Sequence, residues 1–219
     1  MAKKRAAILI SGRGANMAAL IEAAKQSDYP AQIALVLSSR PDAAGLTHAG
    51  AEGVPTETID HRRFGQDRER FDGAVQAALE AHRIEIVCLA GFMRLFTPPM
   101  VLRWSGRMIN IHPALLPSFK GLNTHERALA AGVKIHGASV HFVVPEVDSG
   151  PIIAQAAVPV RDDDTPQRLA ARVLAAELRL YPLALSLLAA GKTSIGAAGG
   201  VHNDAAVSPD AMLVVPDAP

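Results

Sequence analysis

The chain has 219 residues, of which 49% are hydrophobic, and its formal net charge is +1. That length and apolar content suffice for one substantial core, while the near-neutral charge disfavours nucleic acid as the main partner. No apolar run approaches the ~18 residues of a membrane span, so no membrane partner is expected. The single cysteine, Cys88, lies in an apolar run and fits a buried thiol in a reducing cytoplasm.

Short apolar runs alternate with helical segments through the first half of the chain. Strands are predicted at Arg5–Ile10, Ile33–Leu37, Val54–Ile59 and Ile84–Ala90. Helices are predicted at Ala15–Lys25, Ala43–Ala51 and Arg68–His82. Because continuous apolar strands alternate with helices, this half is typical of an α/β fold with a Rossmann-like, doubly wound, mostly parallel sheet.

The second half has longer, partly alternating runs. Its predicted elements are a strand at Met108–Ile111, a helix at Thr124–Ala131, strands at His136–Val144 and Ile152–Val160, and a helix from Thr165 to about Ala190. The two long strands, joined by a turn rich in Pro and Gly, are expected to extend the same sheet in antiparallel fashion. No repeat or linker-like break divides the chain.

We therefore expect a single domain at 1–195, in which one continuous sheet spans a lobe at about 1–104 and a lobe at about 105–195. Residues 196–219 are rich in Ala, Gly and Pro and show little pattern. They are predicted to form a flexible tail.

The loop Ser11–Asn16 follows the first strand and opens a helix. Its glycines allow close approach of the backbone, and the helix start supplies free N–H groups with a partial positive charge. The dinucleotide fingerprint is excluded, because Met17 stands where a third Gly would be, and a Walker A loop is excluded by the missing Gly-Lys-Ser/Thr. Phosphate binding and a plain tight turn are equally compatible with the loop alone.

Asn110 and His112 stand two residues apart, so both side chains share one face of an extended segment. Pro113 follows directly and disfavours a helical conformation at His112. A lone His is usually structural, but this one ends a strand and has an amide on its own face. Asp148 lies in a turn, where Asp is common, yet it would complete a set of oxyanion holder, proton shuttle and orienting carboxylate.

Further features are less specific. Gly91–Leu95 follows the fourth strand, and its apolar residues either line a pocket or enter the core. His136 and His141 stand five apart on one strand, so at most one of them faces a site. Glu177 lies at the margin of the apolar face of the last helix, where an arginine of that helix is the simplest partner. No cluster has the spacing of metal ligands, and no metal is expected.

Taken together, these segments resemble the glycinamide ribonucleotide formyltransferases, the folate-dependent formyltransferase family of purine synthesis. The resemblance covers about residues 6–191. The matching motifs are Ile-Ser-Gly-x-Gly-x-Asn, Leu-Ala-Gly-Phe-Met-Arg, Asn-Ile-His-Pro-x-Leu-Leu-Pro, Gly-x-x-Thr-His, His-Gly-x-Ser-Val-His-Phe-Val, Asp-x-Gly-Pro-Ile-Ile and a late Glu followed by Tyr-Pro. The Asn-x-His and Asp pair is shared by formyl-folate enzymes generally, whereas its combination with the opening loop and Glu177 is more specific.

The resemblance implies roles for the matching positions. The catalytic residues would be Asn110, His112 and Asp148. The ribonucleotide would be bound by Gly14, Ala15, Asn16 and Glu177. The folate would be bound by Arg68, Met93, Arg94, Leu95 and Phe96, with Asn110 shared. The first lobe would then be the nucleotide-binding lobe, and the second the folate and catalytic lobe.

The implied enzyme transfers the formyl group of N10-formyltetrahydrofolate to the amine of glycinamide ribonucleotide, giving formylglycinamide ribonucleotide and tetrahydrofolate. Asn110 and protonated His112 would stabilise the oxyanion of the tetrahedral intermediate, and Asp148 would orient His112 and relay a proton. Folate is a co-substrate, so no permanently bound cofactor is expected. The partners would be small molecules of the cytoplasm, and the protein a monomer or weak homodimer.

The chain departs from the family pattern at Arg13, often Asn, at Ala15, often Ser, and at Asn123, often His. A formyltetrahydrofolate deformylase-like hydrolase and a non-catalytic folate- or nucleotide-binding regulator remain alternatives. The deformylases carry an additional N-terminal domain, and methionyl-tRNA formyltransferases a C-terminal RNA-binding domain, for which we expect no room in this chain. A non-catalytic regulator would be expected to lack one or more residues of the catalytic trio, whereas all three are present.

Overall fold

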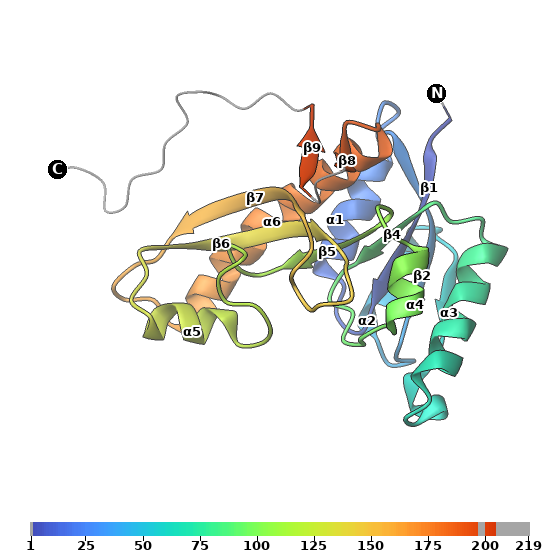
Figure 1. Cartoon of the computed structure of the whole chain (residues 1–219), viewed down its shortest axis with the longest axis horizontal. Helices are drawn as coiled ribbons and strands as arrows, with labels where there is room; N and C mark the ends of the chain where they lie inside the picture. Colours follow the sequence, from blue (N-terminus) through green and yellow to red (C-terminus); the bar gives the residue numbers. More distant parts are fainter. Residues whose placement is uncertain (1, 197–199, 205–219) are drawn as a thin grey trace.

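The structure, a computed structural model, describes residues 2–196 and 200–204. Within them, seven strands form one sheet in the order β3-β2-β1-β4-β5-β6-β7 (Figure 1). The strands are β1 (Lys4–Ile10), β2 (Ala31–Ser38), β3 (Thr56–Thr58), β4 (Ile86–Leu89), β5 (Met108–His112), β6 (Ile135–Phe142) and β7 (Ile152–Pro159). Neighbours from β3 to β5 pair in parallel, while β6 and β7 are antiparallel, which confirms the predicted fold class.

Helices cover both faces of the sheet. They are α1 (Ala15–Ala24), α2 (Ala44–Ala51), α3 (Arg68–Ala81), α4 (Pro98–Arg103), α5 (Thr124–Ala130) and α6 (Pro166–Ala189), with a 3-10 helix η1 at His61–Phe64. Fully buried Ile8 and Ile10 of β1 pack in the core that α1, α5 and α6 cover, whereas Ala7 and Leu9 pack in the core under α3 and α4. Strand side chains alternate between faces, so one apolar strand supplies both cores.

The predicted flexible tail at 196–219 is described only at residues 196 and 200–204. Beyond α6, strands β8 (Thr193–Ile195) and β9 (Val201–Asn203) pair in antiparallel fashion, and Asn203 Nδ2 donates to Ile153 O of β7 at 3.3 Å. Residues 200–204 thus include a short strand that the Ala-, Gly- and Pro-rich composition did not suggest, because a local hairpin supplies its backbone partners. Residues 197–199 and 205–219 lie outside the described part.

Other elements also departed from the expected pattern. α4 and η1 are too short for a helical apolar period to reveal them, and β3 is shorter than its predicted run. The sheet itself runs without interruption from the strands of residues 1–104 to those of 105–195. In the described part of the chain, no helix is both long and apolar enough to cross a membrane.

Tyr181 ties the longest helix to the middle of the sheet. Its side chain is fully buried in α6, and its hydroxyl lies 3.0 Å from Leu89 O and 3.1 Å from Ile109 O. These carbonyls belong to the last residue of β4 and the second residue of β5, so one hydroxyl holds two neighbouring strands. Burial raises the pKa of Tyr181 well above its ordinary value, which keeps it a donor.

Tyr181→Phe removes this donor while keeping the ring, so we expect the free energy of unfolding to fall by about 1–2 kcal/mol. Urea denaturation followed by circular dichroism measures it. Leu183→Ala changes a side chain of the same helix that is 52% exposed, and it serves as the matched control. Equal stability of Tyr181→Phe and the parent protein would contradict the anchoring role.

Candidate active site

The loop between β1 and α1 has a backbone shape that glycine alone suits. Gly14 caps α1 at a φ of 79°, in the left-handed region, and a Cβ there would lie 3.0 Å from Met17 Cε and 3.2 Å from Gly45 Cα. The N–H of Gly45 donates to Gly12 O at 3.1 Å, which ties the loop to α2. α1 has no side-chain cap, so its first N–H groups are left for water or a ligand.

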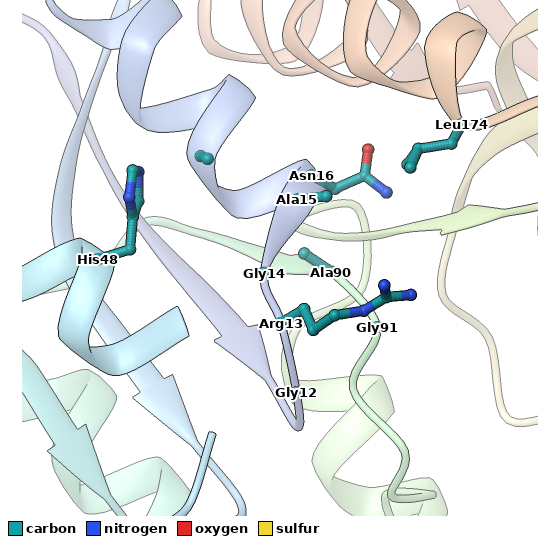
Figure 2. Close-up of a pocket in the computed structure, with 10 residues that line it drawn as sticks. Gly12, Arg13, Gly14, Ala15, Asn16, His48, Ala90, Gly91 and Leu174 are labelled. Atoms are coloured by element: carbon teal, nitrogen blue, oxygen red, sulfur yellow. The ribbon is translucent and has the colours of Figure 1, made fainter. Parts of the chain in front are cut away.

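An open pocket of about 400 Å³ lies at this loop (Figure 2). Its lining residues are Gly12, Arg13, Gly14, Ala15, Asn16, Ala18, His48, Ala90, Gly91 and Leu174. None of these lining residues is acidic. The helix start adds free N–H groups and a partial positive charge, so the pocket suits an anion. Gly14, Ala15 and Asn16, three of the predicted ribonucleotide-binding residues, all lie on it.

Glu177 reaches the same loop from α6. Asn16 Nδ2 donates to Glu177 Oε2 at 2.7 Å, whereas Arg172 of the same helix pairs with Asp164. The expected partner of Glu177 was therefore wrong, because the sheet places α1 beside α6 and brings an amide closer than any arginine. Burial raises the pKa of Glu177, and the bond from Asn16 offsets only part of this effect.

β5 brings Asn110 and His112 to one face of the sheet. Across the β5–β6 ladder, Asn110 lies opposite His141 and His112 opposite Ser139. Asn110 Nδ2 lies 3.2 Å from His141 Nε2. His141 is therefore the imidazole of β6 that faces the site, and His136 does not. Alternation of strand side chains predicted that at most one of the two would face it.

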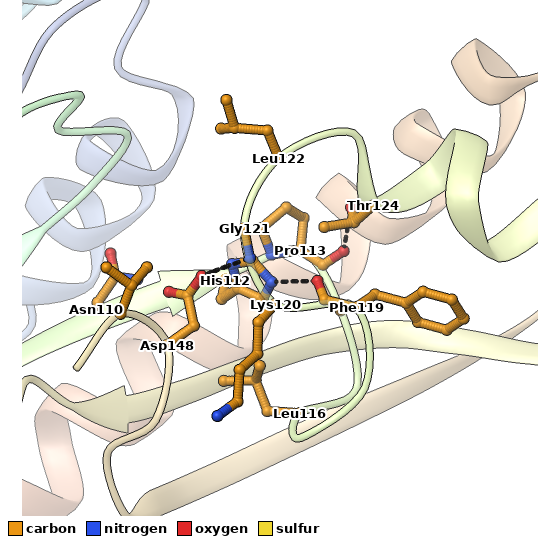
Figure 3. A network of polar contacts seen from close by, with 12 residues as sticks. Asn110, His112, Pro113, Leu116, Phe119, Lys120, Gly121, Leu122, Thr124 and Asp148 are labelled. Carbon is orange, nitrogen blue, oxygen red and sulfur yellow. Dashed lines mark hydrogen bonds and ion pairs between the residues drawn. The ribbon is translucent and has the colours of Figure 1, made fainter.

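Asp148 reaches this face from the loop between β6 and β7 (Figure 3). Its Oδ2 lies 3.4 Å from His112 Nδ1, and its Oδ1 lies 3.7 Å from His141 Nε2. The N–H of Gly121 donates to Asp148 Oδ2 at 2.9 Å. Burial by itself raises the pKa of Asp148, but the bonds from His141 and Gly121 and the charge of His112 outweigh burial and hold the pKa below its ordinary value. A carboxylate thus stands between two imidazoles.

The backbone of the loop aims Asp148 at the site. Asp148 itself has a φ of 49°, in the left-handed region that Asp tolerates better than most residues. A Cβ at Gly150 would collide with the backbone O of Phe142, so the chain passes close to the end of β6 only because residue 150 is glycine. The loop therefore requires glycine at 150 and favours Asp at 148.

Both ring nitrogens of His112 face acceptor oxygens. Nε2 donates to Phe119 O at 3.0 Å, since a carbonyl oxygen can only accept, and Nδ1 faces Asp148. A ring that carries two N–H donors satisfies both acceptors. The 3.4 Å distance from Nδ1 to Asp148 is longer than a charge-assisted hydrogen bond of about 2.7–2.9 Å. A small movement of the carboxylate toward the ring would therefore shorten it to a hydrogen bond.

Buried Ser139 and the amide of Gln155 hold the segment after His112. Ser139 Oγ donates to Ala114 O at 2.7 Å and lies 3.0 Å from the N–H of Leu116, which donates to it. Gln155 Nε2 donates to Leu116 O at 2.9 Å and to Ser139 Oγ at 2.8 Å. Sequence reasoning missed both residues, because they meet this segment only after β6 and β7 have paired.

The predicted folate-binding residues of the loop after β4 differ in exposure. Met93 and Leu95 are 68% and 61% exposed, whereas the side chain of Phe96 is buried among aromatic rings of the core. Arg68 donates to Leu95 O at 2.8 Å and to Phe96 O at 2.9 Å, so its guanidinium holds the loop. Arg94 has no ion-pair partner in the described part of the chain.

Strand pairing joins the anion pocket to the trio. Leu89 of β4 pairs with Asn110 of β5, so the pocket residue Gly91 follows close to the end of β5. The N–H of Ser11 donates to Gly91 O at 3.2 Å, and the N–H of Met93 donates to Ser11 Oγ at 2.9 Å. Pocket, trio and exposed loop thus share the carboxyl edge of β1, β4 and β5, where open α/β sheets bind ligands.

Two further imidazoles lie near the 113–124 segment, His136 fully buried and His125 partly buried. The ring of His136 lies edge-to-face with His125 and with Phe119, each at 5.6 Å between centroids. Within the described residues, Nε2 of His125 makes no hydrogen bond, and burial lowers the pKa of His136 more than its interaction with the backbone of Pro113 raises it. Burial lowers the pKa of both rings, that of His136 to about 4.

Comparison with known proteins decides the family. The sequence pattern of formyl transferases matches residues 4–185. The chain belongs to the formyl transferase family. It is 42% identical over 185 residues to phosphoribosylglycinamide formyltransferase of Escherichia coli, covering 84% of this chain and 87% of that one.

A longer relative and two solved structures agree with this formyl transferase assignment. The human trifunctional purine biosynthetic protein adenosine-3 is 48% identical over 91% of this chain, which spans only 20% of that protein's length. Glycinamide ribonucleotide transformylase 1 from Symbiobacterium toebii superimposes with a TM-score of 0.88 at 43% identity, over 92% of this chain and 94% of that one. A formyltetrahydrofolate deformylase from Pseudomonas syringae has a TM-score of 0.83 at 25% identity, over 92% and 66%.

The depressed pKa of His136 predicts a loss of stability in acid. The unfolded chain protonates near pH 6.5 but the buried ring only near 4, so the unfolded state takes up the proton first as pH falls. The contribution of His136 to the free energy of unfolding is fully present above about pH 6.5. It falls by up to about 1.4 kcal/mol per pH unit as the pH decreases toward 4. Urea denaturation between pH 5 and pH 8 measures this slope.

His136→Leu should make the slope shallower because no proton binds at that position in either state. His202→Gln is the control, since the His202 side chain is 71% exposed. A slope unchanged in His136→Leu would assign the acid sensitivity to other groups.

Proposed function

We propose that this formyl transferase moves the formyl group of N10-formyltetrahydrofolate to the amine of glycinamide ribonucleotide, giving formylglycinamide ribonucleotide and tetrahydrofolate. The proposal rests on family membership and on the joined pocket and trio. The observation that carries it is the approach of Asp148 to His112 Nδ1 at 3.4 Å, on the strand face that also carries Asn110.

The amine nitrogen attacks the formyl carbon, and the carbonyl oxygen takes the negative charge of the tetrahedral intermediate. Asn110 donates a hydrogen bond to that oxygen. Because Nε2 of protonated His112 is bonded to Phe119 O, its Nδ1–H, which faces Asp148 at 3.4 Å, is the second donor. Donors of this kind contribute roughly 10²–10³ in rate. Asp148 takes the proton that the attacking amine loses, directly or through His112. The bond from the formyl carbon to N10 then breaks, and N10 takes up a proton, so charge and atoms balance.

The anion pocket beside the trio favours glycinamide ribonucleotide as the molecule that accepts the formyl group. The backbone of Gly14, Ala15 and Asn16 offers N–H groups at a helix start, as a phosphate requires. Glu177, bonded to Asn16 and otherwise buried, would accept a hydrogen bond from the polar glycinamide or ribose part of the ligand. A substrate with a phosphate at one end and an amine at the other suits a site in which pocket and trio share one edge of the sheet.

The folate would lie on the exposed side of the loop after β4. Met93 and Leu95 present an apolar surface there, and Arg94, which makes no ion pair within the described residues, adds a cation. Backbone groups of Phe96 would contribute where its side chain does not. Arg68 would act through the loop that it holds. We further propose a cytoplasmic enzyme acting on small molecules, monomeric or a weak homodimer, without a resident cofactor or metal and without nucleic acid or membrane as partner.

His112→Ala and Asp148→Asn test the trio. Each variant should lower kcat by roughly 10²–10⁴, because it removes oxyanion stabilisation or proton transfer, while substrate affinity measured by calorimetry changes little. Glu146→Gln is the control for Asp148→Asn, because it also replaces an acid by its amide on the same loop. The Glu146 side chain is 78% exposed, and this variant should retain kcat. Near-normal turnover in both trio variants would overturn the mechanism.

The identity of the formyl acceptor is tested by measuring tetrahydrofolate release with and without glycinamide ribonucleotide. We expect release to require the amine, because this carboxyl edge binds the ribonucleotide next to the formyl donor. A rate independent of the amine would instead favour the hydrolysis performed by formyltetrahydrofolate deformylases. Absence of release under both conditions, with both ligands still bound, would favour a non-catalytic regulator.

A further inference from the structure

Arg13 is a cation without a protein partner at the mouth of the anion pocket. Its side chain is exposed and lines the pocket, and it makes no ion pair or hydrogen bond within the described residues. Several, though not all, of the other exposed arginines have an acidic partner. Arg40, Arg62 and Arg168 each pair with a nearby aspartate at 2.6–2.9 Å.

The direction of the side chain separates Arg13 from a solvated surface arginine. Figure 2 shows its guanidinium extending past Gly91 toward the side of the pocket where Asn16 and Leu174 lie. Leu174 is apolar and offers no bond to an anion. An arginine in this position can turn its fork of N–H donors toward whatever the start of α1 holds.

The charge balance of the pocket leaves a place for a cation. A phosphate monoester carries about −1.5 to −2 charges at pH 7, whereas a helix start offers only about half of one positive charge. Gly14 has no side chain, and Ala15 has no hydroxyl to donate. Besides Arg13, the only basic side chain that lines the pocket is His48. Arg13 is thus the one permanently charged group that lines it.

We infer that Arg13 binds the phosphate of the nucleotide substrate with its guanidinium, in place of the hydroxyl that Ala15 lacks. The inference rests on the proposed function and makes Arg13 a specificity-determining residue for phosphorylated acceptors. A guanidinium matches two phosphate oxygens at once. The backbone N–H groups of the loop orient the phosphate, and Arg13 neutralises it from the open side.

Arg13→Gln removes the charge and tests this role. The KM for glycinamide ribonucleotide should rise about 10- to 100-fold, the usual worth of a charge-assisted contact, while kcat and the KM for the folate stay within twofold. Arg13→Lys keeps a charge but loses the planar fork, so it should recover part of the affinity. Arg179→Gln removes an exposed arginine of α6 that does not line the pocket, and it should leave all constants unchanged.

A substrate without the phosphate separates phosphate binding from a structural effect. Glycinamide riboside should be handled equally by the parent protein and by Arg13→Gln, because it has no phosphate for residue 13 to bind. Equal losses with the riboside and the ribotide would overturn the inference. A raised KM for the folate alone would also overturn it, by placing Arg13 on the folate side.

Calorimetry with ribose 5-phosphate distinguishes failure of this inference from failure of the proposed function. A tenfold weaker binding to Arg13→Gln supports the phosphate role even if the parent protein transfers no formyl group. Unchanged ribose 5-phosphate affinity in an enzyme that does transfer the formyl group would overturn the role of Arg13 and leave the function standing.

Discussion

The position of one carboxylate between two imidazoles is the constraint on which the rest of the candidate site depends. Asp148 approaches His112 and His141 at ion-pair distances, and the N–H of Gly121 bonds the oxygen nearer to His112. These four residues come from a strand, its antiparallel neighbour and two loops. The β5–β6 register, the close passage of Gly150 past Phe142 and the segment after His112 must therefore all be correct for the site to exist.

Asp148 and Glu177 show how surroundings separate two buried carboxyl groups. Around Asp148, hydrogen bonds and a neighbouring charge exceed the cost of burial and depress its pKa, whereas Glu177 has a single amide partner and its pKa is raised. A buried charge that loses its partner is far costlier than a surface one. The first carboxyl is thus suited to hold charge beside an imidazole, and the second to receive a hydrogen bond from a ligand.

Several residues illustrate what sequence patterns could and could not predict. The strands, the long helices and the shared face of Asn110 and His112 follow from periodicity and alternation, which are local properties. Alternation also limited the site to at most one of His136 and His141. Ser139 and Gln155 escaped notice because their bonds to the segment after His112 cross two strand pairings. The β8–β9 hairpin was missed because its composition resembles a disordered tail, although backbone pairing does not depend on an apolar pattern.

The sequence by itself determined the mostly parallel sheet with an antiparallel extension, the glycine-dependent loop and the residue types of the trio, since short-range spacing encodes each of them. Only the tertiary structure decided that Asp148 meets His112, that Glu177 bonds Asn16 rather than an arginine of its own helix, and that Arg68 holds a loop. The reason is physical. Partners far apart in sequence are chosen by strand order and helix packing, and burial then sets how strongly their charges interact.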